Sequence, residues 1–202
     1  MIIRIEAITK TAGELLDQLD QKAWYIPVLA KMGESRQREW LTVRVLLKNI
    51  LGEEKQVLYT ESGKPYIVDS SCYISISHTK GYVAVALDEK QPVAIDIERI
   101  SSRVENIRSR FMNEIEEQNL SKTHPVIHLL LHWSAKETLF KYLDESDIEF
   151  QSQLYIHPFE PVTGEWNECT AHETRTEQQQ KFHLSYFVAQ DYVITALPSK
   201  TI

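Results

Sequence analysis

Two periods of hydrophobicity run along the chain, and together they predict a mixture of helices and strands. A period near 3.6 residues predicts a helix over residues 34–52, which Gly52 would end, and a second long helix after Pro125. A shorter helix is expected at residues 11–20, and a weaker helical pattern begins near Val104. The apolar stripe of the first long helix consists of Trp40, Val43, Leu47 and Ile50.

Alternation with a period of two predicts strands. The first residues carry charges at Arg4 and Glu6 within an apolar run, which is typical of an edge strand rather than a signal peptide. Residues 62–66 (SGKPY) are expected to form a turn. Further strands are predicted at residues 72–77, 82–87, 93–98, 152–157, 182–189 and 192–197. This order of helices and strands predicts an α+β fold.

The two long predicted helices share a pattern that is consistent with an internal repeat. Residues 40–48 (WLTVRVLLK) and 133–141 (WSAKETLFK) both begin with Trp and end with Lys, and each helix is later followed by a pair of strands. Two repeats of about a hundred residues, approximately 1–100 and 101–202, would form two similar halves with a cleft between them. A chance likeness between amphipathic segments is an equally weighted alternative.

Composition and charge restrict the class of protein. The 202 residues are 43% hydrophobic and 25% charged, and no apolar run approaches the roughly 20 residues that span a bilayer. A net charge of −7 argues against general nucleic-acid binding, and two cysteines are too few for a disulfide framework. We therefore expect a soluble cytoplasmic protein that binds neither nucleic acid nor membranes. Because the chain would hold both halves, we also expect a monomer.

Residues 93–98 (VAIDIE) place two carboxylates on one strand. Successive side chains of a strand point to opposite faces, so Asp96 and Glu98 would lie on the same face, about 6–7 Å apart. On a solvated strand face, water would screen the repulsion between these like charges. Alternatively, a bound cation would neutralise it. Mg²⁺ prefers oxygen ligands and completes its shell with water and substrate phosphates. The pair is therefore a candidate for phosphate chemistry.

The second candidate lies on the last long helix. Glu137 and Lys141 are four residues apart and face the same way, with Trp133 one turn before them. A surface Glu–Lys pair would stabilise the helix by a few tenths of a kcal/mol, which is the simpler explanation. In the functional alternative, Glu137 binds the metal while Lys136 and Lys141 neutralise phosphate oxygens.

The third candidate is residues 75–82 (SISHTKGY), at the end of a predicted strand. Ser75 and Ser77 alternate with isoleucines, and His78 opens the turn. A serine hydrolase would need a nucleophile elbow such as G-x-S-x-G, which this chain lacks. His78 would either cap the turn, or bind a phosphate or carry a proton near neutral pH.

Five segments occur in an order that resembles the 4′-phosphopantetheinyl transferase superfamily, in its larger, two-repeat, surfactin-synthetase-activating branch. They are GKPY (63–66), SISHTKGYVAVAL (75–87), VAIDIE (93–98), RFMNEIE (110–116) and WSAKETLFK (133–141). The strongest marks of that family are a G-[IV]-D-[IVL]-E strand and a W-[ST]-x-K-E-[AS]-x-x-K helix. The resemblance implies a pseudo-dimer of two α+β halves, each a small antiparallel sheet packed with a long helix, with coenzyme A at their junction.

The resemblance also implies an activity, that of a holo-[acyl-carrier-protein] synthase type of transferase. Such an enzyme moves the 4′-phosphopantetheine arm of coenzyme A to a serine of an apo acyl, peptidyl or polyketide carrier protein and releases adenosine 3′,5′-bisphosphate. Mg²⁺, or alternatively Mn²⁺, would be the metal. The alternatives are a coenzyme A- or carrier-binding module without turnover, and another Mg²⁺-dependent phosphotransferase or pyrophosphate hydrolase.

Matching the family's motifs position by position implies a role for each acidic residue of this chain's motifs. Asp96, Glu98 and Glu137 match the metal ligands. Glu116, in RFMNEIE, matches an acid that holds a metal-bound water or takes the proton of the carrier serine, a role that Glu137 could also fill. The resemblance does not choose between these two bases.

Basic and polar positions match the family's contacts to coenzyme A. Lys141 and His78 match positions at the pyrophosphate, Lys64 and Ser77 match positions near the adenosine, and Arg44 loosely matches an arginine near the 3′-phosphate. The complete set of candidate coenzyme-binding residues is Arg44, Lys64, Pro65, Ser77, His78, Lys136 and Lys141. Arginines that follow the acidic strand, such as Arg103 and Arg108, would receive an acidic carrier protein.

Overall fold

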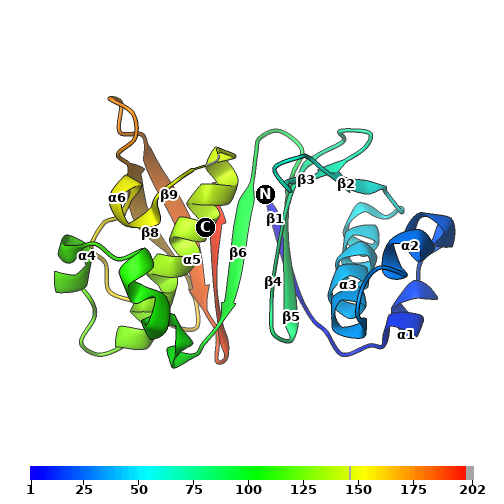
Figure 1. The fold of residues 1–202 in the computed structure, drawn as a ribbon, viewed down its shortest axis with the longest axis horizontal. Helices are drawn as coiled ribbons and strands as arrows, with labels where there is room; N and C mark the ends of the chain where they lie inside the picture. Colours follow the sequence, from blue (N-terminus) through cyan, green and yellow to red (C-terminus); the bar gives the residue numbers. More distant parts are fainter. Residues whose placement is uncertain (146, 199–202) are drawn as a thin grey trace.

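In this computed structural model, residues 1–145 and 147–198 are described, and they form two antiparallel sheets that pack against each other (Figure 1). A long helix covers the outer face of each sheet, so the layers run helix, sheet, sheet, helix. The predicted α+β class is confirmed. No helix in the described ranges combines the length and the apolar character that a membrane span requires.

The first part of the chain contributes a three-stranded sheet and a small hairpin. Its elements are β1 (Ile2–Ala7), α1 (Ala12–Leu16), α2 (Lys22–Leu29), α3 (Glu34–Leu51), β2 (Val57–Tyr59), β3 (Pro65–Ile67), β4 (Tyr73–Thr79) and β5 (Tyr82–Asp88). The strand order is β1-β5-β4, so β1 is an edge strand as its charges indicated. Helix α3 ends where predicted, because Gly52 takes the left-handed conformation (φ 76°) that favours glycine.

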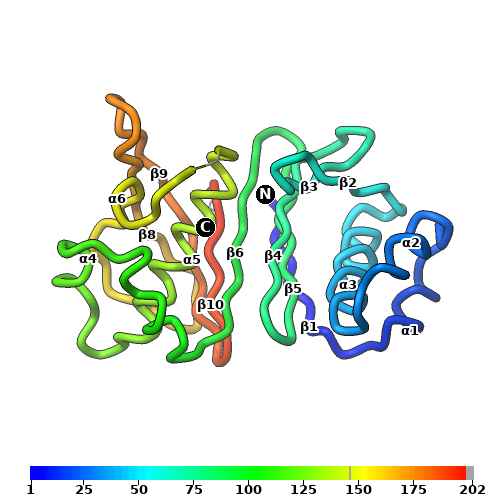
Figure 2. Tube along the Cα trace, viewed as in Figure 1, coloured from blue at the N-terminus to red at the C-terminus, as the bar shows by residue number. Residues whose placement is uncertain are grey.

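The remainder of the chain forms a five-stranded sheet. Its elements are β6 (Ala94–Arg99), the 3₁₀ helix η1 (Ser102–Arg110), α4 (Glu114–Gln118), α5 (Pro125–Leu143), α6 (Phe150–Gln153), β7 (Leu154–Ile156), β8 (Trp166–Glu173), β9 (Lys181–Val188) and β10 (Tyr192–Leu197). The strand order is β6-β10-β9-β8-β7. Within the described residues, the chain passes from the first sheet to the second once, between β5 and β6 (Figure 2).

Several elements differ from the sequence-based expectation, among them the short β2, β3, α4 and α6, which were not predicted. Helix α2 was not predicted, because its residues are apolar without a helical period and include Pro27. Strand β8 was also missed, since its buried side chains include the weakly apolar Cys169 and Ala171, and pairing with both β7 and β9 supports it instead. The helical pattern near Val104 belongs to a 3₁₀ helix.

The two sheets meet along β4 and β6, where side-chain hydroxyls replace a backbone ladder. Three hydroxyl oxygens of β4 accept hydrogen bonds from alternate amides of β6: Ser75 Oγ from Ile95 (3.1 Å), Ser77 Oγ from Ile97 (3.3 Å) and Thr79 Oγ1 from Arg99 (3.1 Å). These bonds satisfy donors that would otherwise be unpaired at a sheet edge. The alternation of serines with isoleucines therefore joins the two sheets.

The faces of β6 follow the predicted alternation. Ile95 and Ile97 pack with Ala84 and Ala86 of β5 in the core between the sheets. Asp96 and Glu98 lie on the other face and contact side chains of α5. The apolar face thus anchors the strand, and the carboxylates are held at the junction.

Candidate active site

Asp96 lies in the middle of β6 and joins three elements at the junction of the sheets. Its side chain is buried, and Oδ1 accepts a hydrogen bond from Ser77 Oγ of β4 at 2.9 Å. The same oxygen forms an ion pair with Lys141 Nζ of α5 at 2.7 Å. Lys141 Nζ also donates to Ser77 Oγ and to the carbonyl of Ile95, both at 3.1 Å. The structure therefore brings together three residues that the sequence had singled out.

Glu98 and Glu137 add two further carboxylates beside Asp96. Burial raises the pKa of Glu98 to about 7, and the charge of Asp96 raises it in the same direction. Burial and the charge of Asp96 likewise raise the pKa of Glu137 to about 7. The indole of Trp133 donates a hydrogen bond to Glu98 Oε1 at 2.7 Å and fixes its orientation. The three acids repel one another because they share one poorly solvated region.

This set of oxygen donors fits a hard divalent cation by its chemistry. The second oxygen of Asp96, Oδ2, is buried and has no hydrogen-bond partner, and a cation would relieve the repulsion between the acids. Within residues 1–145 and 147–198, however, no three His, Cys, Asp or Glu side chains are gathered in the geometry of a metal site. The acids therefore fit the ion in type and charge but are less closely gathered than the ligands of a loaded site.

His78 lies at the end of β4 and contacts α3. Its Nε2 is 2.6 Å from Arg36 Nη1, and its Nδ1 is 3.8 Å from Glu39 Oε2. Burial lowers the pKa of His78, and the charge of Arg36 lowers it further. Arg36 belongs to no motif, so only its place on a basic helix could have pointed to it.

Lys64 and Pro65 bring the β2–β3 hairpin to the end of α5. Lys64 Nζ forms an ion pair with Asp144 Oδ2 at 3.1 Å across the junction. Both residues line a cavity of about 270 Å³ together with Ser75 and Lys141. The cavity therefore opens beside the ammonium that holds Asp96.

Arg44 is not brought to the acidic cluster, which consists of Asp96, Glu98 and Glu137. Its guanidinium is buried in the first part of the chain, 3.7 Å from the centre of the Trp40 ring, and it donates to the hydroxyl of Tyr59 at 3.1 Å. Burial lowers its pKa, and the interaction with Tyr59 opposes this effect. The hydrogen bond to Tyr59 connects α3 to β2, whereas the stacking on Trp40 lies within α3.

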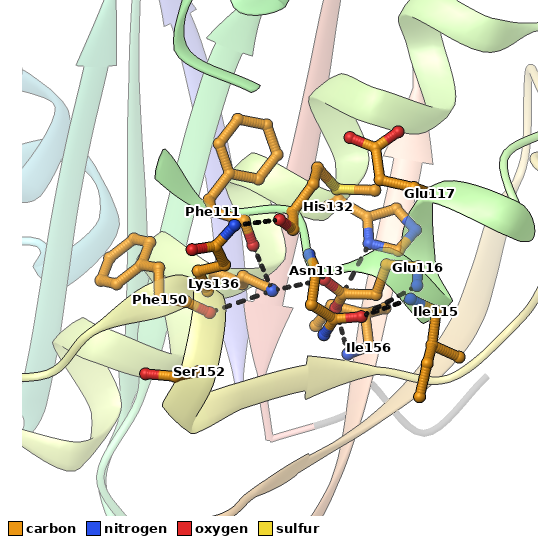
Figure 3. Close-up of polar contacts among 12 residues, drawn as sticks. Phe111, Asn113, Ile115, Glu116, Glu117, His132, Lys136, Phe150, Ser152 and Ile156 are labelled. Atoms are coloured by element: carbon orange, nitrogen blue, oxygen red, sulfur yellow. Dashed lines mark hydrogen bonds and ion pairs between the residues drawn. The ribbon is translucent and has the colours of Figure 1, made fainter. Parts of the chain in front are cut away.

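Lys136 and Glu116 form a buried pair of their own and make no hydrogen bond with Asp96. Both side chains are 0% exposed, and Lys136 Nζ lies 2.7 Å from Glu116 Oε2 (Figure 3). The ammonium and the carboxylate are thus paired with each other and shielded from solvent. The contact of Lys136 with a substrate phosphate and the role of Glu116 at a carrier serine stay predictions.

A groove of about 690 Å³ opens on the other side of Glu98. Glu98 and Trp133 line this groove, and Ile107 contributes apolar surface. Arg103 is exposed at the groove, whereas Arg108 is already engaged by Glu117. The acidic cluster thus lies between this groove and the cavity at Lys64.

Comparison with known proteins assigns the chain to a family. The family model described as the 4′-phosphopantetheinyl transferase superfamily matches residues 92–197, just over half of the chain, including both β6 and α5. The chain therefore belongs to this superfamily, as its motifs indicated.

The similar proteins are named as transferases of the same class. A 4′-phosphopantetheinyl transferase of Bacillus subtilis is 35% identical over 88 residues, which are 40% of this chain and 38% of that protein. The 4′-phosphopantetheinyl transferase gsp of Aneurinibacillus migulanus is 30% identical over 153 residues, 74% of this chain and 58% of the relative. AcpT of Escherichia coli O157:H7 is 28% identical over 118 residues, 55% and 60% of the two chains. The matched part thus covers less than two thirds of each relative.

Proposed function

We propose that this protein transfers the 4′-phosphopantetheine arm of coenzyme A to a serine of an apo carrier protein and releases adenosine 3′,5′-bisphosphate. The observation that carries the proposal is the convergence of Asp96, Glu98, Glu137 and Lys141 at the junction of the sheets, within the region that matches the superfamily. The reaction is of the holo-[acyl-carrier-protein] synthase type.

Asp96, Glu98 and Glu137 would hold a Mg²⁺ or Mn²⁺ ion. When bound, such an ion polarises the attacked phosphate and neutralises the charge that develops on the leaving bisphosphate. Lys141 is 27% exposed, so its ammonium can serve a pyrophosphate oxygen as well as Asp96. Of the two acids considered as base, only Glu137 is accessible, since Glu116 is buried. We therefore assign to Glu137 the proton of the carrier serine.

The two sides of the acidic cluster receive different substrates in this proposal. The cavity that Lys64, Pro65 and Lys141 line would take coenzyme A, and Ser77 is hydrogen-bonded to Lys141 beside it. His78 lines a separate cavity, and its contact with the pyrophosphate is part of the proposal. The groove at Trp133 and Arg103 would take the carrier protein. The serine would then meet the pyrophosphate between them.

We also infer that the chain is a pseudo-dimer of two α+β halves and acts as a monomer in the cytoplasm. Each part has an antiparallel sheet covered by one long helix, and α3 and α5 carry Trp and Lys at the same separation. The boundary near residue 100 is approximate. Strand β6 lies before residue 100 in the sequence, yet it pairs with β10 and so belongs to the second sheet.

The proposed reaction is tested by the intact mass of an apo acyl carrier protein incubated with this protein, coenzyme A and Mg²⁺. We expect the carrier to gain the mass of the phosphopantetheine arm, and EDTA to prevent the gain. Binding of coenzyme A without any gain across several carriers would instead identify a binding module. Consumption of coenzyme A without a modified carrier would identify a hydrolase.

The groove at Arg103 predicts how the carrier approaches. Because Arg103 is exposed, Arg103→Gln is expected to raise the KM for an acidic carrier roughly two- to fivefold and to weaken its dependence on salt, with kcat unchanged. Arg108→Gln should do less, since Glu117 already pairs with that guanidinium. An unchanged KM and salt dependence in Arg103→Gln would place the carrier on another surface.

A further inference from the structure

Lys136 has a fully buried ammonium whose three protons all have acceptors. Nζ donates to Glu116 Oε2 at 2.7 Å, to the carbonyl of Phe111 at 2.5 Å and to the carbonyl of Phe150 at 3.0 Å (Figure 3). A buried charge is costly unless it is paired and fully hydrogen-bonded. Burial lowers the pKa of Lys136, and the carboxylate of Glu116 opposes this effect. The ammonium thus ties α5 to two backbone carbonyls and to the side chain of Glu116.

Glu116, the partner of Lys136, makes further hydrogen bonds with backbone amides. Its Oε2 also accepts from the amide of Asn113 at 3.1 Å, and its Oε1 accepts from the amide of Ile156 in β7 at 2.8 Å. Burial would raise the pKa of Glu116, but His132 and Lys136 together hold it below its ordinary value. The carboxylate therefore stays charged and connects α4, α5 and β7.

The same two residues whose carbonyls hold Lys136 also pack on Trp133. The ring centroid of Phe111 lies 5.3 Å from that of Trp133, and the ring centroid of Phe150 lies 5.6 Å from that of Trp133. Trp133 in turn donates its indole proton to Glu98 at 2.7 Å. A continuous chain of contacts therefore runs from the buried ion pair to a carboxylate of the proposed active site.

We propose that Lys136 and Glu116 are positioning residues that fix Phe111 and Phe150, and through them the orientation of Trp133 and Glu98. Neither side chain touches coenzyme A or the carrier. The expected effect on the transfer rate rests on the proposed function. The expected effect on the orientation of Trp133 does not depend on that function, so an experiment can refute one without refuting the other.

The variants that test this role are Lys136→Met, Glu116→Gln and the double variant. Each single substitution leaves one buried charge without its partner, so both are expected to lower Tm strongly. The double variant removes both charges and should recover most of that Tm loss. The matched control is Lys55→Met with Asp69→Asn, which removes an ion pair on the opposite part of the chain.

The readout independent of activity is the indole N–H resonance of Trp133 in a ¹H–¹⁵N spectrum. The chain has four tryptophans, and Trp133→Phe assigns the relevant peak. We expect the double variant to shift this resonance and leave the other three unchanged, and the control to shift none. Phe150→Leu keeps the ion pair but removes one ring, and it should shift the Trp133 peak as well. An unmoved Trp133 peak in both would overturn the proposal.

Kinetics distinguish positioning from direct contact. The double variant is expected to lower kcat about 10- to 100-fold, because a misplaced carboxylate acts on the reacting atoms, while KM for coenzyme A stays within about twofold. A raised KM with unchanged kcat would mean that Lys136 binds the coenzyme and would overturn the proposal. A parent protein without transfer activity would refute the proposed function, and the indole measurement would still decide the positioning role.

Discussion

Asp96→Asn is expected to lower the rate of phosphopantetheine transfer by about 10²- to 10³-fold while the chain stays folded. The substitution keeps the size of the side chain but removes the charge that pairs with Lys141 and the oxygen Oδ2 that is available to a cation. Ser77 can still donate to the amide oxygen. The loss should therefore concern the reaction and not the junction of the sheets.

The measurement is the initial rate of carrier modification by intact mass, with saturating coenzyme A and Mg²⁺, alongside a thermal melt. Asp69→Asn is the matched control, because Asp69 pairs with Lys55 on the surface and lies outside the cluster. A rate within a few fold of the parent for Asp96→Asn would remove Asp96 from the proposed metal site.

Much of the site could be predicted because it depends on local periodicity. The alternation in VAIDIE correctly placed Asp96 and Glu98 on one face of β6, and the apolar stripe correctly bounded α3. Glu137 and Lys141 are four residues apart on α5, so they face the same side.

The two lysines of α5 show where that reasoning was incomplete. Lys136 and Lys141 are five residues apart, and an advance of roughly 100° per residue places them about 140° apart around the helix. Lys141 faces the acidic cluster, whereas Lys136 faces the core, so the two lysines cannot bind the same phosphate. The periodicity contained this information, whereas the motif alone suggested that every charged position acts on the substrate.

Other contacts depend on tertiary structure and have no local signal. The pairing of Lys64 with Asp144 joins residues 80 positions apart, and the indole of Trp133 reaches Glu98 across 35 positions. The guanidinium of Arg44 donates to the hydroxyl of Tyr59, 15 positions further along the chain. Periodicity places a side chain on a face, but only packing decides which distant group that face meets.

Glu137→Gln is the second substitution for which we expect a large effect, a loss of about 10²- to 10³-fold in transfer rate. The variant removes both a proposed ligand and the proposed base. Without a cation, the carboxylate of Glu137 is repelled by Asp96, so Tm of the metal-free variant at pH 8 should equal or exceed that of the parent. Glu114→Gln, at an exposed position of α4, is the control.

Binding of Mn²⁺, followed by electron paramagnetic resonance, separates the two roles of Glu137. Weakened binding together with lost activity is expected, and intact binding with lost activity would leave Glu137 as a base only. Because Asp96 and Glu137 would act on one ion, the double variant Asp96→Asn/Glu137→Gln should be little slower than the worse single variant. Strictly additive losses would mean that the two carboxylates act independently, which would contradict a shared cation at the junction of the two sheets.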